Sequence, residues 1–397
     1  MTGQKLEGQV LKVAVVAGEV SGDLLGGDLI SALKRAHAGP VDLVGVGGDA
    51  LQAQGLTSLF DFSELSIMGF TQVLKRLPQL IRRIGQTADA IIAARPDVLV
   101  IIDSPDFTHR VAKRVRAALP YLPIVNYVCP SVWAWKEYRA RAMVPYVDHV
   151  LAILPFEPEV MERLQGPPTT FVGHRLTSDP ALLKVRAIRS QMPVKQSGEP
   201  KTVMLLPGSR SAEIRALLPI FGATAAAFVE RNGPTRFLLP TVPRQEAMVR
   251  EIAQTLPIAP EVTVTAESKW NAFAQADVAL AASGTVLLEL GLAGVPAVSA
   301  YKADWLITMM SKRIKIWSAA LPNLISDCPI IPEYINEMVR PGSLCRWAER
   351  LSSDTLQRRA MMEGFDLTWQ RLQMPVPPGE AAAGIVLQML ERKKPGH

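Results

Sequence analysis

Cysteine is scarce in this chain of 397 residues, and the three that occur, Cys129, Cys328 and Cys345, are scattered without Cys-x-x-Cys spacing. A zinc site built on closely spaced cysteines is excluded, and an odd, sparse set fits a reducing compartment. The N-terminus has no signal-peptide pattern, because the apolar run 10–17 is short and interrupted by Lys12. No apolar run reaches membrane-spanning length, so we expect a soluble or peripheral protein in the cytoplasm.

The composition and net charge of the chain say little about which kind of ligand or surface it binds. Hydrophobic residues make up 48% of the chain and charged residues 20%, which is ordinary for a globular protein. The formal net charge of +6 favours acidic ligands or anionic membranes without choosing between them. No basic face with interleaved exposed aromatics is recognisable, so no nucleic-acid partner is expected.

Short apolar runs alternate with longer helical patterns, which is the βαβ rhythm of a doubly wound parallel sheet. The chain is too long for one core, and the polar, proline-containing stretch 193–200 reads as a linker. We therefore expect two Rossmann-like α/β domains, 1–195 and 196–397, with closing C-terminal helices and the ligand in the interdomain cleft. The expected strands are Val10–Ala17, Leu43–Val46, Val98–Ile102, Ile124–Val128, His149–Leu154, Thr202–Leu206, Arg236–Leu239, Val262–Thr265, Val278–Ala281 and Ala297–Ser299.

The loop Gly18–Asp23 follows the first predicted strand. Its glycines let backbone amides approach a ligand at the start of the next helix, although Gly-x-Gly-x-x-Gly is absent. A plain turn capped by Ser21 or Asp23 is an almost equally good interpretation. Glu19 favours the ligand site, because a carboxylate at this edge of a sheet has little structural purpose.

The loop 103–106 follows another predicted strand and contains two acidic residues. Asp103 comes first off the strand, where it can accept a proton from an attacking hydroxyl. Asp106 is expected to cap the following helix, and His109 is expected on that helix's surface. A third loop of this kind contains Trp133 and Trp135, for which core packing is favoured over a sugar-binding wall.

In the second domain, Leu205–Arg210 joins a strand, a glycine-containing turn and a helix start. This arrangement binds phosphate through backbone amides, here those of Gly208 and Ser209, and Arg210 adds a guanidinium suited to a diphosphate. Glu213 fits a capping box at the same helix start.

The turn Ser283-Gly284-Thr285 follows a further strand, and its small residues allow close approach of a phosphate or sugar. Glu289 lies one helical turn beyond Thr285 on the same face. A carboxylate there can accept both hydroxyls of a ribose, and within an apolar helix it needs partners. Together with Leu205–Arg210, these residues predict the pyrophosphate-and-ribose pocket of an enzyme that uses a nucleotide-sugar.

Two stretches combine apolar and basic residues. The first, 65–88, has no acidic residue and includes Lys75, Arg76, Arg82 and Arg83, and it is expected to form two helices with Pro78 at the second start. The second is Trp305–Trp317. Each fits a core-facing helix with a solvated basic face, but two such stretches support contact with an anionic membrane surface.

With these residues in place, the chain resembles the lipid-A-disaccharide synthases, bacterial glycosyltransferases of family 19 with the GT-B architecture. Each motif alone is weak, but their order and spacing are highly specific. The chain departs from the family's pattern at two positions: Cys129 replaces an expected Ser, and Arg175 replaces a common Pro. Neither residue is assigned a catalytic role. The matching segments are Ala17–Asp23, Ile102–Phe107, Pro130–Trp135, Leu154–Glu157, Phe171–His174, Leu206–Arg210, Ala282–Thr285 with Glu289, and Leu321–Leu324.

The resemblance implies that UDP-2,3-diacylglucosamine and 2,3-diacylglucosamine 1-phosphate are condensed to a β-1′,6-linked lipid A disaccharide 1-phosphate, with release of UDP. It also implies peripheral attachment to the inner face of the inner membrane, since both substrates carry acyl chains. No cofactor is expected, and the lack of an Asp-x-Asp motif predicts no essential metal. The oligomeric state stays open, and a homodimer is compatible with the sequence.

An inverting displacement is the expected mechanism, with Asp103 as the base for the acceptor's 6-hydroxyl. Arg210 and the amides of Gly208 and Ser209 would neutralise the departing UDP, with Asn323 as a nearby hydrogen-bond donor. Glu19, with the Ser21–Gly22 turn, would orient the sugar or the acceptor phosphate. The alternative is an enzyme like UDP-N-acetylglucosamine 2-epimerase, which shares the architecture and needs no lipid acceptor. A non-catalytic nucleotide-binding module is a remote third.

Overall fold

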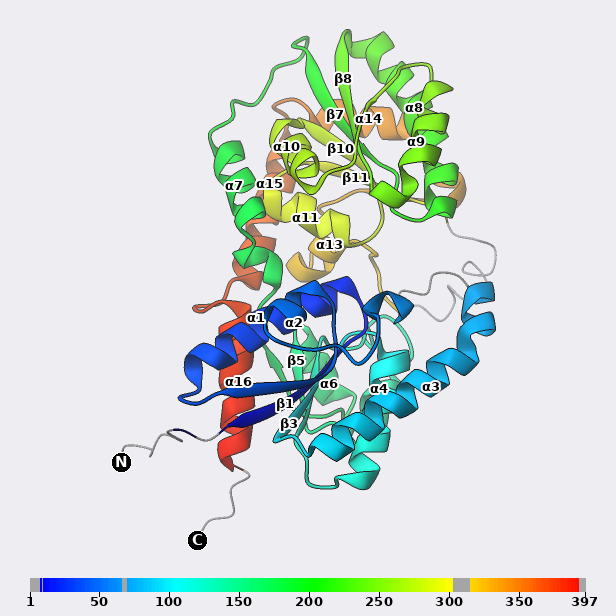
Figure 1. Ribbon diagram of the computed structural model, residues 1–397. Coiled ribbons are helices and arrows are strands. Elements are labelled where there is room, and N and C mark those ends of the chain that lie inside the picture. Colours follow the sequence, from blue (N-terminus) through cyan, green and yellow to red (C-terminus); the bar gives the residue numbers. More distant parts are fainter. Residues whose placement is uncertain (1–7, 9, 66–69, 303–314, 393–397) are drawn as a thin grey trace. The chain divides into compact units, whose positions relative to one another are not determined.

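The computed structural model describes residue 8 and residues 10–65, 70–302 and 315–392 (Figure 1). The chain divides into two compact units. Unit 1 consists of Met1–Arg175 together with Met374–His397, and unit 2 is Leu176–Gln373.

Unit 1 is built on a parallel sheet with six strands among the described residues, in the order β2-β1-β3-β4-β5-β6. β3 is buried along its whole length, as expected for a continuous apolar run covered on both faces. The strands are β1 (Leu11–Ala17), β2 (Val41–Val46), β3 (Val98–Ile102), β4 (Ile124–Tyr127), β5 (His149–Ala152) and β6 (Thr169–Phe171). The helices are α1 (Val20–Ala36), α2 (Asp49–Ala53), α3 (Phe70–Ala94), α4 (Pro105–Ala118), α5 (Tyr138–Met143), α6 (Glu157–Arg163) and α16 (Pro378–Arg392).

Unit 2 repeats this design with a parallel sheet that has, in the described part of the chain, six strands in the order β12-β11-β10-β7-β8-β9. One apolar core joins its strands to α8, α14 and α15. The strands are β7 (Lys201–Leu206), β8 (Thr235–Pro240), β9 (Glu261–Thr263), β10 (Val278–Ala282), β11 (Ala297–Tyr301) and β12 (Glu333–Ile335). The helices are α7 (Pro180–Ser190), α8 (Ser211–Asn232), α9 (Glu246–Gln254), α10 (Ala266–Gln275), α11 (Thr285–Ala293), α13 (Leu321–Ser326), α14 (Pro341–Leu351) and α15 (Leu356–Leu372).

Each sheet reverses its strand order once. In unit 1 the chain adds β2 on one side of β1 and then crosses to β3 on the other side. In unit 2 it adds β8 and β9 beside β7 and then crosses to β10. Ligands of open α/β sheets bind outside the carboxyl ends of the strands at such a switch point. The sheet topology therefore points to the loops after β1 and β3 in unit 1, and after β7 and β10 in unit 2.

The boundary between the units differs from the expected one at residue 195. Helix α7 belongs to unit 2, because Arg186 and Arg189 donate hydrogen bonds from it to the carbonyl oxygens of Leu292 and Gly294, at 3.0 and 2.9 Å. The linker-like stretch 193–200 is thus a loop inside unit 2.

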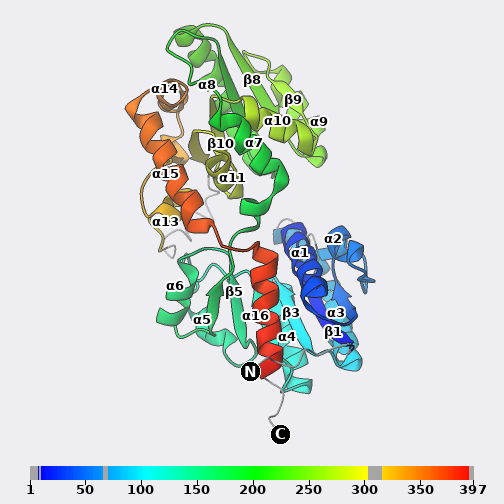
Figure 2. The ribbon, with the colours of Figure 1, turned by 90° about the vertical axis from the view of Figure 1, so that its left-hand side faces the viewer.

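The C-terminal helix was also expected in the second domain, and it belongs to unit 1 instead. Helix α16 lies against α1, as Figures 1 and 2 both show, and the side chains of Ala382, Ala383 and Val386 are buried in the same core as Leu29. Burial of this apolar face is a tertiary effect that no linker composition reveals.

Two helices differ from expectation. The stretch 70–94 is a single helix, α3, with Pro78 inside it, rather than two helices with Pro78 at the second start. Helix α8 is long and apolar enough to cross a membrane by length and composition, contrary to the expectation that no such run exists. Its side chains Leu218 and Phe221 are completely buried against the sheet of unit 2, which is the environment of a core helix.

Candidate active site

The loops after β1 and β3 lie in contact at the switch point of unit 1. A Cβ atom added to Gly18 would come within 2.2 Å of the Cβ of Ser104, so only glycine allows this approach. The Ser104 hydroxyl donates to the Glu19 carboxylate at 3.4 Å, and the Ser21 hydroxyl donates to Asp103 Oδ2 at 3.4 Å. The structure thus brings together Glu19, Ser21 and Asp103, which the sequence had placed in two separate loops.

Asp103 adopts an unusual backbone conformation. Its φ is 55° and that of Ser104 is 43°, two consecutive left-handed residues that are not glycine. Hydrogen bonds hold the loop in place: Ser104 N donates to Asp103 Oδ1 at 2.7 Å, and the Thr108 hydroxyl donates to the Asp103 carbonyl oxygen at 2.7 Å. Strained backbone of this kind is found where a side chain is fixed in a functional position.

Asp23 has a structural role that differs from the expected cap. Helix α1 begins after Glu19, and the Asp23 side chain does not cap it. Its carboxylate is buried and accepts hydrogen bonds from the backbone amides of Gly48, Ala50 and Leu51 at 2.7, 2.8 and 3.2 Å. These amides belong to the start of α2, where a negative charge is favourable.

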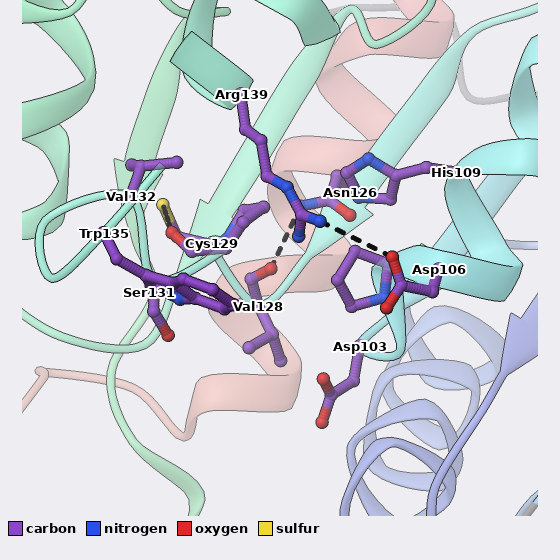
Figure 3. A pocket seen from close by; sticks show the side chains of 12 residues that line it. Asp103, Asp106, His109, Asn126, Val128, Cys129, Ser131, Val132, Trp135 and Arg139 are labelled. Atoms are coloured by element: carbon purple, nitrogen blue, oxygen red, sulfur yellow. Dashed lines mark hydrogen bonds and ion pairs between the residues drawn. The ribbon is translucent and has the colours of Figure 1, made fainter. Parts of the chain in front are cut away.

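A pocket of about 260 Å³ opens beside Asp103 (Figure 3). Two expectations for α4 are wrong here: Asp106 does not cap the helix, and His109 lines the pocket instead of lying on the outer surface. His109 Nδ1 lies 3.0 Å from the Tyr146 hydroxyl, and burial lowers the pKa of His109 to about 4. The other lining residues are Pro105, Asn126, Val128, Cys129, Pro130, Ser131, Val132, Trp135 and Arg139.

The two tryptophans of the third loop have different surroundings, and neither belongs to the buried core in which they were expected: Trp133 is half-buried beside Phe156, with ring centres 5.4 Å apart. Trp133 Nε1 donates to Glu157 Oε1 at 3.1 Å, while Glu157 Oε2 accepts from the amides of Ile153 and Leu154. Burial raises the pKa of this carboxyl to about 8, whereas its three N–H donors favour the ionised form. Trp135 is 37% exposed and lines the pocket.

Replacing Trp133 with Phe should destabilise the protein. The indole N–H is removed and a completely buried carboxyl loses one of its donors, so the free energy of unfolding should fall by about 1–3 kcal/mol. Denaturant unfolding of Trp133→Phe measures this. Trp135→Phe is the control, and an equal loss in both variants would contradict the structural role of Trp133.

In unit 2, the loop after β7 leads directly from the end of that strand, Leu206, to the start of α8 at Ser211. Gly208 has a φ of +105°, and a Cβ there would lie 2.4 Å from Glu213 Oε2. Glu213 Oε1 accepts from the Arg210 guanidinium at 2.7 Å, and Glu213 Oε2 from the Arg210 amide at 3.4 Å. The predicted capping role of Glu213 is therefore confirmed, with Arg210 as the residue before the helix.

Gly208→Ala should weaken nucleotide binding. The added methyl group must displace the Glu213 carboxylate, and L-residues rarely adopt φ near +105°, so the loop has to change its conformation. We expect the Kd for UDP to rise by about 10-fold or more, from lost amide contacts of roughly 1–3 kcal/mol. Isothermal titration with UDP measures this, and Gly233→Ala, at a positive φ with open space around it, is the control for backbone strain alone.

The loop after β10 brings Ser283, Gly284 and Thr285 to the start of α11. Gly284 has a φ of +146°. Glu289 has the partner that its position requires, because Lys269 Nζ lies 2.7 Å from Glu289 Oε2. A ribose at Glu289 would have to share this carboxylate with Lys269.

The role expected for Asn323 is not supported. Its side chain is buried, its Oδ1 accepts from the amides of Ile330 and Ile331, and its Nδ2 donates to the Ile331 carbonyl oxygen at 3.0 Å. A further contact joins Nδ2 to Glu333 Oε2 at 3.4 Å. Asn323 therefore fixes the loop after α13 and has no donor left to offer a nucleotide.

Sequence reasoning missed four side chains at these loops. Arg244 and Gln245 donate to the Ser209 carbonyl oxygen at 3.4 and 3.2 Å, Lys269 pairs with Glu289, and Arg139 lines the pocket beside Asp103. Each lies on a helix or turn at least 20 residues away along the chain, so no local motif pointed to it.

The basic stretches are only partly described. Arg83 is paired with Glu64, with Nη2 2.6 Å from Oε1, so it is not a solvated basic side chain. Arg82 and Ile81 are exposed. The side chains of Lys75 and Arg76, and most of the second stretch, lie outside the described residues.

Two doubly wound parallel sheets, each with ligand-binding loops at its own switch point, are the architecture of the GT-B class of α/β proteins. The structure of the kitacinnamycin glycotransferase matches with a TM-score of 0.60 at 18% identity, covering 97% of this chain and 99% of that one. The UDP-GlcNAc 2-epimerase of Neisseria meningitidis, bound to UDP-GlcNAc, gives 0.58 at 12% identity, with 96% and 100% covered. At these identities the likeness shows the fold alone, so the epimerase alternative rests on fold resemblance.

The sequence relatives identify the family. A model of the lipid-A-disaccharide synthetase family matches residues 13–371. The lipid-A-disaccharide synthase of Nitrobacter winogradskyi is 46% identical over 390 residues, with 96% of each chain covered. The chain therefore belongs to the lipid-A-disaccharide synthase family and is a glycosyltransferase.

Proposed function

We propose that the chain transfers 2,3-diacylglucosamine from its UDP conjugate to the 6-hydroxyl of 2,3-diacylglucosamine 1-phosphate, with inversion at the anomeric carbon. The position of Asp103 carries this proposal: its carboxylate lies at the carboxyl end of β3, at the switch point of unit 1, on the wall of a pocket. A base is needed at this place because the attacking hydroxyl loses its proton as the new bond forms.

The leaving UDP is assigned to unit 2. The amides of Gly208 and Ser209 and the guanidinium of Arg210 suit the diphosphate, and the turn 283–285 lies at the same switch point. Glu289 would accept the ribose hydroxyls while Lys269 holds its other side. In this mechanism Asp103 takes the proton, and UDP leaves with the electron pair of the broken bond.

In the N-terminal half, Glu19 is assigned to the sugar rather than to the acceptor phosphate. A carboxylate repels a phosphate and accepts hydrogen bonds from sugar hydroxyls. The Glu19 carboxylate accepts a hydrogen bond from the hydroxyl of Ser104, the residue that follows Asp103, so Glu19 lies close to the proposed base. Ser21 and Gly22 complete this turn.

Attachment to the anionic inner face of the inner membrane is part of the same proposal. Ile81 and Arg82, consecutive residues of α3, are both exposed, so the surface of that helix carries an apolar and a basic group. A homodimer, which the sequence allows, is also part of the proposal.

The test is an assay with both lipid substrates, in which UDP release and the linkage of the product are determined together. A β-1′,6-linked disaccharide formed in step with UDP supports the proposal. Epimerisation of the donor without acceptor would replace it with the epimerase-like alternative, and UDP binding without any product would leave a nucleotide-binding module.

A further inference from the structure

Arg139 is a wall residue of the pocket beside Asp103, and the mechanism above gives it no task. It lies on α5, and its side chain is 30% exposed. Its guanidinium is 3.5 Å from Asp106 Oδ1 and 6.0 Å from the centre of the Trp135 ring. The Asp106 side chain is 84% exposed, and a surface ion pair at this distance contributes little. Most of the five N–H donors of Arg139 are therefore available to a ligand.

The charges that line the pocket single out Arg139. Burial lowers the pKa of His109 to about 4, which leaves its imidazole neutral at physiological pH. Among the described lining residues, the permanent positive charge therefore comes from Arg139, while Asp103 and Asp106 are negative. An anionic group entering this pocket would be drawn toward Arg139 and away from Asp103.

The size and layout of the pocket suit one phosphorylated sugar. Its volume, about 260 Å³, lies just below the usual range of ligand pockets, roughly 300–1,000 Å³, and so suits a single sugar better than a whole nucleotide-sugar. Figure 3 shows Arg139 and Asp103 on different sides of the pocket, with Trp135 along a third. In a glucosamine 1-phosphate, the 6-hydroxyl and the phosphate extend from the two carbons beside the ring oxygen. One sugar can therefore reach both side chains.

We propose that Arg139 binds the 1-phosphate of the acceptor and so turns its 6-hydroxyl toward Asp103. The planar guanidinium can donate two parallel hydrogen bonds to phosphate oxygens, which fixes orientation as well as position. The partly exposed Trp135 ring, with the Lys136 ammonium 3.9 Å from its centre, provides the aromatic wall against which the sugar lies. Asp106 competes with the phosphate for the same guanidinium. This inference rests on the proposed function, because it concerns the acceptor of that reaction.

The test compares two acceptors, 2,3-diacylglucosamine 1-phosphate and the same lipid without its phosphate. Arg139→Met should lower kcat/KM for the phosphorylated acceptor by about 10–100-fold, and change it by about twofold or less for the other, as expected for a lost charged hydrogen bond. The loss should appear in KM, because the phosphate is bound in both the ground and the transition state, and also in kcat, because the 6-hydroxyl is no longer held toward Asp103. Asp106→Asn should lower KM for the phosphorylated acceptor, because it removes a competing charge. Arg141→Met, an exposed arginine of the same helix outside the pocket, is the control.

Each result decides between the alternatives. Equal losses on both acceptors, or an unchanged preference for the phosphate, would overturn the assignment of Arg139. Retained preference in Arg139→Lys with its loss in Arg139→Met would support it. Failure of the proposed function looks different, because the unmodified protein would then form no disaccharide from either acceptor.

Discussion

Asp103→Asn is expected to lower kcat by about 10²–10⁴-fold while UDP still binds, because a positioned general base contributes rate enhancement of that size. The exchange is close to isosteric. Asn tolerates a left-handed backbone, here with φ of 55°, and its side-chain oxygen can still accept from Ser104 N. The loop should therefore keep its shape and lose only the ability to take a proton. Single-turnover kinetics with saturating lipids, together with titration of UDP, measure the two effects.

The control for this prediction is Asp42→Asn, which removes an exposed carboxylate from β2 of the same unit. Near-normal turnover in Asp103→Asn with intact UDP binding would remove Asp103 from the mechanism. A variant that loses both turnover and UDP binding would instead indicate a folding defect, which thermal unfolding would reveal.

The fold was largely predictable because most of its strands coincide with short apolar runs in the sequence. β3 is fully buried and coincides with the predicted strand Val98–Ile102, and each of the other nine predicted strands overlaps an observed one. The two missed strands, β6 and β12, have three residues each, and the observed segments Thr169–Phe171 and Glu333–Ile335 include polar side chains. β9 also has three residues, but it overlaps the alternating run Val262–Thr265, whereas β6 and β12 lie in no such run and are strands only through pairing with a neighbour.

The site was predictable where a single loop carries it and unpredictable where distant side chains complete it. Gly208 and Arg210 follow a strand directly, so the order strand, turn and helix start was enough to find them. Asn323 was misassigned because a local motif cannot show that Ile330 and Ile331 use up its amide group. The missed Arg139 reaches the pocket only because β4 pairs with β3, which places the following loop and α5 beside Asp103.

The predicted boundary between the units, at residue 195, was also wrong because it depends on contacts between residues far apart in the sequence. Linker composition at 193–200 was readable, but the loop is held to unit 2 by contacts such as Lys195 Nζ to Asp277 Oδ2 at 2.8 Å. Proline and glycine mark where a chain turns, and long-range contacts decide to which core the flanking segments belong.

Arg210→Met is expected to lower kcat by about 10²–10³-fold and to weaken UDP binding less, by roughly 10-fold. Negative charge builds up on the leaving diphosphate in the transition state, so a guanidinium aimed at it stabilises that state more than the ground state. Glu213 restrains this guanidinium, because its carboxylate lies 2.7 Å from Arg210 Nη1. The measurements are steady-state kinetics on both lipids and titration of UDP.

Arg215→Met provides the matched control, since Arg215 is exposed one turn further along α8 and carries the same charge. If general electrostatic attraction of the anionic donor were responsible, both variants would lose activity alike, and the loss would shrink as salt concentration rises. A specific contact predicts a large loss in Arg210→Met alone, mostly in kcat. A loss of UDP affinity with an unchanged kcat would mean that Arg210 only binds the nucleotide, and the charge on the leaving group would then be neutralised by the Gly208 and Ser209 amides.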